Sequence, residues 1–246
     1  MAMAGEAVLG ISAIQQWEYI EEMRKKLQRK MDVCMTQMQD SSWNQREKGF
    51  KALLRLMATF TSEERSVFAI VQREQNCNLQ HLLFQQLKLR MSPAMAYDVK
   101  ISNQVASVLE MLQGVALLHY DSKLKAGAKQ NMMLLLTFLP SKSTVVAIAA
   151  IEAVQGILID SSQNIRIFEQ IGGVPVVCET LKSKHVSEAV LHKCIELLYL
   201  YLQPEDKNPD RAVGEIIFSK SVELKRESIT KLLGPGFVKK LMDIST

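Results

Sequence analysis

The chain has few cysteines, and none of them stands in the paired spacing of a zinc or redox motif. Its 246 residues include Cys34, Cys77, Cys178 and Cys194, and no two of these form a Cys-x-x-Cys pair. Cys178 and Cys194 stand among apolar residues of predicted helices, which favours buried free thiols over disulfides or zinc ligands. We therefore expect a reducing compartment and no metal.

A strong excess of charge of one sign is also missing, as are long uninterrupted apolar runs. Lys and Arg number 30 against 26 Asp and Glu, a net charge of +4 that is dispersed along the chain. So small an excess gives no reason to expect nucleic-acid binding. The apolar runs are broken by charge or glycine short of a membrane span, and residues 1–9 lack the basic and apolar regions of a signal peptide. We expect a cytosolic protein without membrane insertion.

The residue patterns of familiar enzyme classes are absent. There is no glycine-rich phosphate loop, no His-Arg-Asp catalytic loop and no Gly-x-Ser-x-Gly elbow, and no two histidines stand at metal-ligand spacing. A cysteine phosphatase needs an Arg six residues after its nucleophile. The residues at these four positions are Asp40, Leu83, Lys184 and Leu200. We expect no catalytic residues and no cofactor, and we keep an enzyme with an unusual site as the least favoured alternative.

Apolar residues at helical spacing are present almost throughout. Val, Leu, Ile, Met and Ala recur in this way, whereas alternating strand patterns between hairpin turns are absent. We predict an all-α fold and a single domain over residues 1–246, because no long polar or Gly/Ser-rich tract divides it. A long first helix is predicted over residues 12–38, and we favour a role for it as a cap over a separate contact. Its apolar seam, interpreted as core, consists of Leu27, Met31, Met35 and Met38.

A helical repeat is clearest within residues 103–205. Gln113-Gly114 and Gln155-Gly156 lie 42 positions apart, within the period of roughly 40 to 47 residues that armadillo and HEAT units show. Gly172-Gly173 predicts a sharp corner between helices, because glycine tolerates a positive backbone torsion. A third copy is predicted in which Ile195, Leu198 and Tyr199 stand at the positions that Val154, Ile157 and Leu158 have in the second. We predict an armadillo/HEAT-like helical-repeat solenoid, a fold that usually holds another protein.

Two further residues of the repeat are interpreted as structural. Asn164, before the glycine corner, is expected to cap a helix or to tie backbone groups together, and Phe168 is expected in the core. On the predicted helix 186–202, Tyr201 projects toward the apolar stripe, whereas a second group of side chains lies on the polar face or its rim. These candidate partner-binding residues are His192, Lys193, Glu196, Tyr199 and Leu200. An aromatic group beside apolar and charged ones is typical of an interface, although a neighbouring segment could cover it instead.

The chain resembles the fungal family called cell division control protein fourteen, a component of the septation initiation network unrelated to the phosphatase of that name. The match is good from about Val108 to Glu205 and weaker over residues 48–87. The residues that carry it are Leu112-Gln113-Gly114, Leu117-Leu118-His119, Asn164, Arg166, Phe168-Glu169, Gly172-Gly173, Lys193-Cys194, Glu196 to Leu202 and Pro204-Glu205.

The resemblance implies an armadillo-like, non-catalytic scaffold or activating subunit of a germinal-centre (Ste-twenty-related) protein kinase in cytokinesis. It also implies a cytoplasmic protein associated with the spindle pole or centrosome, and it specifies neither the kinase nor a homo-oligomer. The alternative is a generic armadillo adaptor for cytoskeletal or trafficking proteins. Both readings share one fold, so the fold alone does not separate them.

Overall fold

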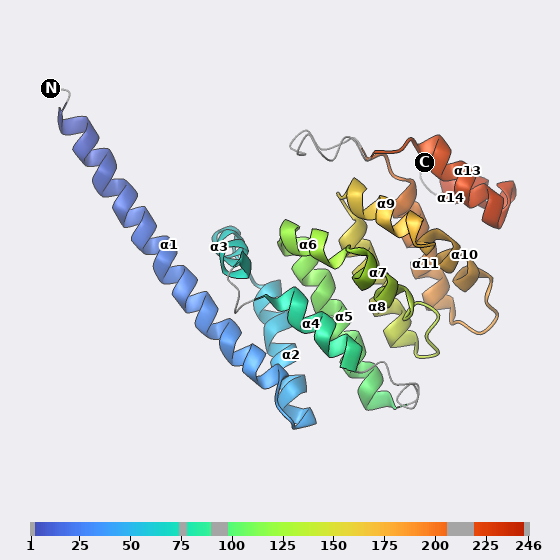
Figure 1. Ribbon diagram of the computed structural model, residues 1–246, viewed down its shortest axis with the longest axis horizontal. Helices are drawn as coiled ribbons and strands as arrows, with labels where there is room; N and C mark the ends of the chain where they lie inside the picture. Colours follow the sequence, from blue (N-terminus) through green and yellow to red (C-terminus); the bar gives the residue numbers. More distant parts are fainter. Residues whose placement is uncertain (1–2, 74–77, 90–97, 206–218, 244–246) are drawn as a thin grey trace. The chain divides into compact units, whose positions relative to one another are not determined.

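All regular structure in the described part of the chain is helical, which confirms the predicted all-α fold. The computed structural model describes residues 3–73, 78–89, 98–205 and 219–243 (Figure 1). The chain forms two compact units, residues 1–79 and residues 80–246. That both units unfold together as one domain, and that the first helix caps the repeats, stay predictions.

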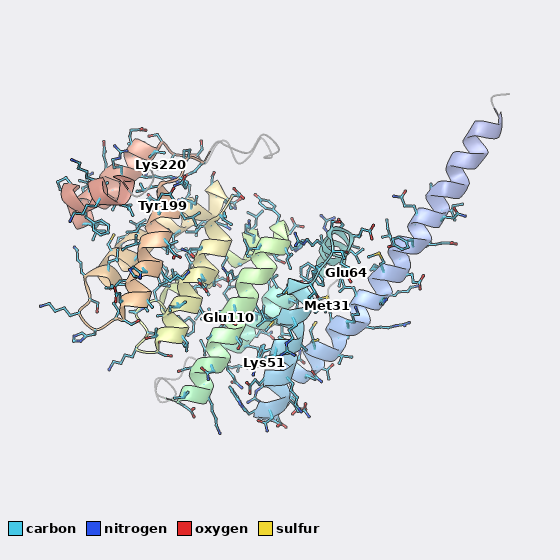
Figure 2. All side chains as sticks on the ribbon, turned by 180° about the vertical axis from the view of Figure 1, so that it is seen from behind. Met31, Lys51, Glu64, Glu110, Tyr199 and Lys220 are labelled. Carbon is cyan, nitrogen blue, oxygen red and sulfur yellow. The ribbon has the colours of Figure 1, made fainter. Side chains whose placement is uncertain are left out.

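The first unit is built on α1 (Met3–Met38), against which α2 (Trp43–Ala58) and α3 (Ser62–Arg73) pack. The predicted seam of α1 is core: Leu27, Met31 and Met38 are buried and Met35 is half-buried. Figure 2 labels Met31 on α1. A capping box begins α3, because the Thr61 N–H donates to Glu64 Oε2 and the Glu64 N–H donates to Thr61 Oγ1, each at 3.1 Å.

The second unit follows with α4 (Leu79–Leu89), which starts at the boundary, and α5 (Val99–Leu118). Two groups of two short helices and one long helix come next. They are α6 (Tyr120–Ala126), α7 (Lys129–Leu136) and α8 (Thr144–Leu158), then α9 (Ser162–Gln170), α10 (Gly173–Lys182) and α11 (Glu188–Leu202). Helices α13 (Val222–Leu233) and α14 (Pro235–Asp243) complete the unit. This short-short-long order is compatible with armadillo repeats.

Helix α8 occupies the centre of the second unit. It packs between α5 and α11, and α6, α7 and α9 also contact it. This agrees with its apolar residues on nearly all sides, since neighbours cover both flanks. Helix α5 is long and apolar enough to cross a membrane, but 50% of its most apolar stretch is buried inside the protein, and a core helix has the same composition.

The same positions are buried in successive long helices. Most buried positions of α5 recur 42 residues later in α8, and those of α11 lie 44 residues after buried positions of α8. The sequence pattern placed the third copy 41 residues after the second. The observed interval is 44 residues, so this prediction was wrong by three residues. The interval is longer because α9 has 9 residues where α6 has 7. The true counterparts of Val154, Ile157 and Leu158 are Leu198, Tyr201 and Leu202, all of them buried.

The glycine corner divides two requirements between its two residues. Gly172 carries the positive torsion, with φ 81°, as the N-terminal cap of α10. Gly173 does not carry it; a Cβ there would lie 2.3 Å from the ring of Phe168, which is fully buried as predicted. The positive torsion expected at this corner therefore falls on Gly172 alone, and Gly173 allows close packing of the Phe168 ring.

Asn164 ties backbone groups together, as predicted. Its buried side-chain Nδ2 donates to Lys123 O at 3.1 Å and to Ile157 O at 3.0 Å, so it joins the end of α8 to α6. The helix cap itself is Ser161, whose Oγ accepts from the Asn164 N–H. At the position 42 residues earlier, His119 Nδ1 accepts from the Ser122 N–H in the same way.

Candidate partner-binding face

Helices α5, α8 and α11 present equivalent positions of three repeats on one face, which we call the repeat face. At the intervals of 42 and 44 residues, Glu110, Glu152 and Glu196 are equivalent. Figure 2 labels Glu110 on α5 and Tyr199 on α11. Because each long helix lies beside the next, equivalent residues form rows that run across the helices.

A groove of about 360 Å³ is hollowed in the repeat face. All but one of its lining residues, Glu196, stand at positions equivalent to another lining residue. The lining residues are Gln113, Leu117, Gln155, Gly156, Ile159, Glu196, Tyr199, Leu200 and Gln203. Gly156 lets α5 and α8 approach closely at its floor, since a Cβ there would lie 2.9 Å from Gln113 Cγ. The two Gln-Gly motifs that revealed the repeat in the sequence therefore help to build a surface feature.

Three of the five predicted partner-binding residues line this groove: Glu196, Tyr199 and Leu200. Tyr199 is 37% exposed and Leu200 is half-buried, whereas Tyr201 is 1% exposed and belongs to the core, as predicted. His192 is exposed on the same helix outside the groove. Of the predicted structural residues, Gln113 joins the groove, while Gly114 is half-buried beside it on α5.

Lys193 connects two members of the glutamate row. Its Nζ lies 3.0 Å from Glu152 Oε1 and 2.8 Å from Glu196 Oε2, and hydrogen bonds to Glu196 and Glu152 raise the pKa of Lys193. On α5, burial and the charge of Glu152 raise the pKa of Glu110. The row thus holds three carboxylates and one ammonium group, and Lys193 connects α11 to α8 through Glu152.

A charged cluster that sequence reasoning missed joins α9, the end of α11 and α13. Glu205 Oε1 lies 2.6 Å from Arg166 Nη2 and 2.6 Å from Lys225 Nζ, and both Glu205 and Lys225 are buried. The Lys225 Nζ also donates to Gln203 O at 3.0 Å and lies 5.3 Å from the centre of the Tyr201 ring. A lysine is ordinarily exposed, so nothing in the sequence marked Lys225.

Glu169 forms the second acidic centre of this cluster. Its carboxylate lies 2.9 Å from Arg166 Nη1 and 3.4 Å from Lys220 Nζ, and it accepts a hydrogen bond from the Tyr201 hydroxyl. Burial, followed by this bond to Glu169, raises the pKa of Tyr201. Burial lowers the pKa of Lys225, against the opposing effect of Glu205. Arg166 and Glu205, which carried the family resemblance, therefore connect α9 and the end of α11 to α13.

The cysteine thiols in the described part of the chain are not activated as nucleophiles. Its cysteines are free and buried, and burial raises the pKa of Cys178 to about 11 and that of Cys194 to about 12, so neither is a thiolate at neutral pH. Cys77 lies outside the described residues. The described residues contain no group of three His, Cys, Asp or Glu placed to hold a metal. The described fold is that of an all-helical protein in which the buried positions of three long helices recur at intervals of 42 and 44 residues.

The chain belongs to the family described as cell division control protein 14, SIN component, whose sequence profile matches residues 20–234. The family resemblance read from the residues is thereby confirmed. Membership supports a role in septation and cytokinesis signalling, and it is compatible with a non-catalytic protein.

Two individual proteins are similar to the chain. Cell division control protein 14 of Schizosaccharomyces pombe is 30% identical over 111 residues, which are 45% of this chain and 46% of that protein. The similarity thus spans about half the length of this curated relative. The crystal structure of an engineered protein is similar over 86% of this chain and 92% of the engineered chain, with 14% sequence identity and a TM-score of 0.48.

Proposed function

We propose that the chain is a non-catalytic scaffold or activating subunit that binds a germinal-centre (Ste-twenty-related) protein kinase in septation signalling. The observation that supports this most directly is the groove of the repeat face, in which Tyr199 and Leu200 meet side chains of two preceding repeats. A partner that covers this groove removes apolar area from water beside charged groups, which is the composition of an interface core and its rim. We place this complex in the cytoplasm and at the spindle pole.

Affinity purification of the full chain, followed by identification of bound proteins, tests this function. We expect the kinase to copurify with the parent and with Leu224→Arg, because Leu224 is 50% exposed on α13 outside the groove. Leu200→Arg should lose the kinase, since it removes apolar contact and places an unpaired charge in the interface, at a cost of about 2 to 5 kcal/mol of binding. Kinase activity measured with and without the chain separates activation from localisation.

Melting curves of the same variants check that loss of binding is not loss of folding. Leu200→Arg should melt close to the parent, whereas Leu198→Arg should unfold the repeat because Leu198 is fully buried. Retained kinase binding by Leu200→Arg would remove this face from the proposal. Recovery of cytoskeletal or trafficking proteins without a kinase would favour the generic adaptor instead.

A further inference from the structure

We infer that the groove of the repeat face takes an extended peptide segment in which large apolar residues are flanked by Lys or Arg. The inference rests on the proposed function only for the identity of the protein that carries the segment. Three observations support it: the charge of the glutamate row on the same face, the apolar side chains within the groove and the amides that line it.

The glutamate row, of which Glu196 lines the groove and Glu110 and Glu152 do not, favours a basic segment. Glu110, Glu152 and Glu196 form one row across three helices, and Lys193 offsets only part of this charge by contacting two of them. Among the residues that line the groove, one is acidic and none is basic. A cationic side chain placed along the row meets carboxylates on every repeat, whereas an acidic one is repelled.

The groove also offers solvent-exposed apolar surface. Leu117 is 54% exposed and Tyr199 is 37% exposed, and the half-buried Leu200 and Ile159 line the same groove. Side chains of this kind, surrounded by polar groups, mark binding surfaces more often than single exposed leucines do. They require apolar groups in the occupant as well as basic ones.

The amides of the groove favour an extended occupant over a helical one. Gln113 and Gln155 stand at equivalent positions on neighbouring helices, and Gln203 lies at the end of the third. Side-chain amides can donate to and accept from a peptide backbone. A helix has already paired its backbone groups internally, while an extended segment leaves them available to successive glutamines.

Three fluorescein-labelled peptides test this chemistry by fluorescence anisotropy with the purified full chain. Each has about ten residues, because an extended chain spans about 3.3 Å per residue and packed helices lie about 10 Å apart. The first contains leucines flanked by Arg, the second replaces Arg with Glu, and the third replaces Leu with Ser. We expect only the first to bind well, and its affinity should fall as salt is raised.

Variants of the full chain assign that binding to the groove. Leu117→Arg and Leu200→Arg should each weaken the first peptide by about tenfold or more, and Leu224→Arg should leave it unchanged. Glu196→Gln should weaken it less and reduce the salt dependence. Leu117 is the more exposed of the two groove leucines, so Leu117→Arg carries the test if Leu200→Arg disturbs folding.

Equal binding of the acidic peptide, or parent-like affinity of both groove variants, would overturn the inference. Failure of the proposed function looks different. A kinase that copurifies equally with the parent and with Glu196→Gln, while none of the peptides binds, refutes the inference and leaves kinase binding standing. Binding of the basic peptide in the groove without any copurifying kinase leaves the inference standing and refutes the kinase.

Discussion

The two adjacent glycines of the corner before α10 meet different physical demands. The backbone of Gly172 has a φ of 81°, and nothing lies within 4 Å of the place its Cβ would take. Gly173 has ordinary torsions, but the Phe168 ring occupies the space of a side chain. A substitution at the first position strains the backbone, while one at the second displaces a buried ring.

At the residue scale we predict that Gly173→Ala lowers the free energy of unfolding by about 1 to 3 kcal/mol, the cost of overpacking a rigid core. Gly172→Ala should cost about 1 kcal/mol through its positive torsion. Denaturant unfolding measures both, with Gly236→Ala as the control, because its Cβ meets no atom within 4 Å. A Gly173→Ala protein as stable as this control would show that Phe168 moves aside without cost.

At the scale of elements, the charged cluster around Glu205 connects helices that are far apart in the chain. Lys225 of α13 reaches Glu205 beyond α11, which in turn contacts Arg166 of α9. Desolvation opposes such pairs, so their presence does not show a net gain in stability. Removing one partner is a different matter, because it leaves the other charge buried.

We therefore predict that Lys225→Ala lowers the free energy of unfolding by about 3 kcal/mol, near the lower end for a broken buried pair because Arg166 still contacts Glu205. Lys193→Ala is the matched control: its ion pairs are partly exposed, and it should cost less than about 1 kcal/mol. Urea unfolding of both variants makes the comparison. Equal stabilities would mean that water reaches the cluster readily.

At the scale of the whole molecule, the repeats depend on their neighbours. The segment between Ser141 and Ser143 connects α7 to α8, so a break there separates α5 from the central helix against which it packs. Each fragment would then expose an apolar helix face that the intact chain covers.

We predict that neither residues 1–141 nor residues 143–246 form a stably folded protein, whereas the full chain unfolds cooperatively as one domain. Circular dichroism and limited proteolysis of the fragments measure the first part, and calorimetry of the full chain measures the second. Separate transitions for residues 1–79 and residues 80–246 would contradict the single domain. A cooperative transition in either fragment would contradict the dependence of the repeats on one another.

The sequence by itself determined the helical class and the inward direction of Tyr201, because these follow from a local periodicity of 3.6 residues. It also determined the 42-residue period, because Gln113-Gly114 recurs as Gln155-Gly156. It also marked Glu196, Tyr199 and Leu200 as the outward residues of α11. The tertiary structure decided the register of the third repeat, since two extra residues in α9 shift everything after it. It alone decided the groove, which exists only where three helices lie side by side, and the burial of Lys225, whose pairing with Glu205 depends on the packing of α13 and on no local pattern.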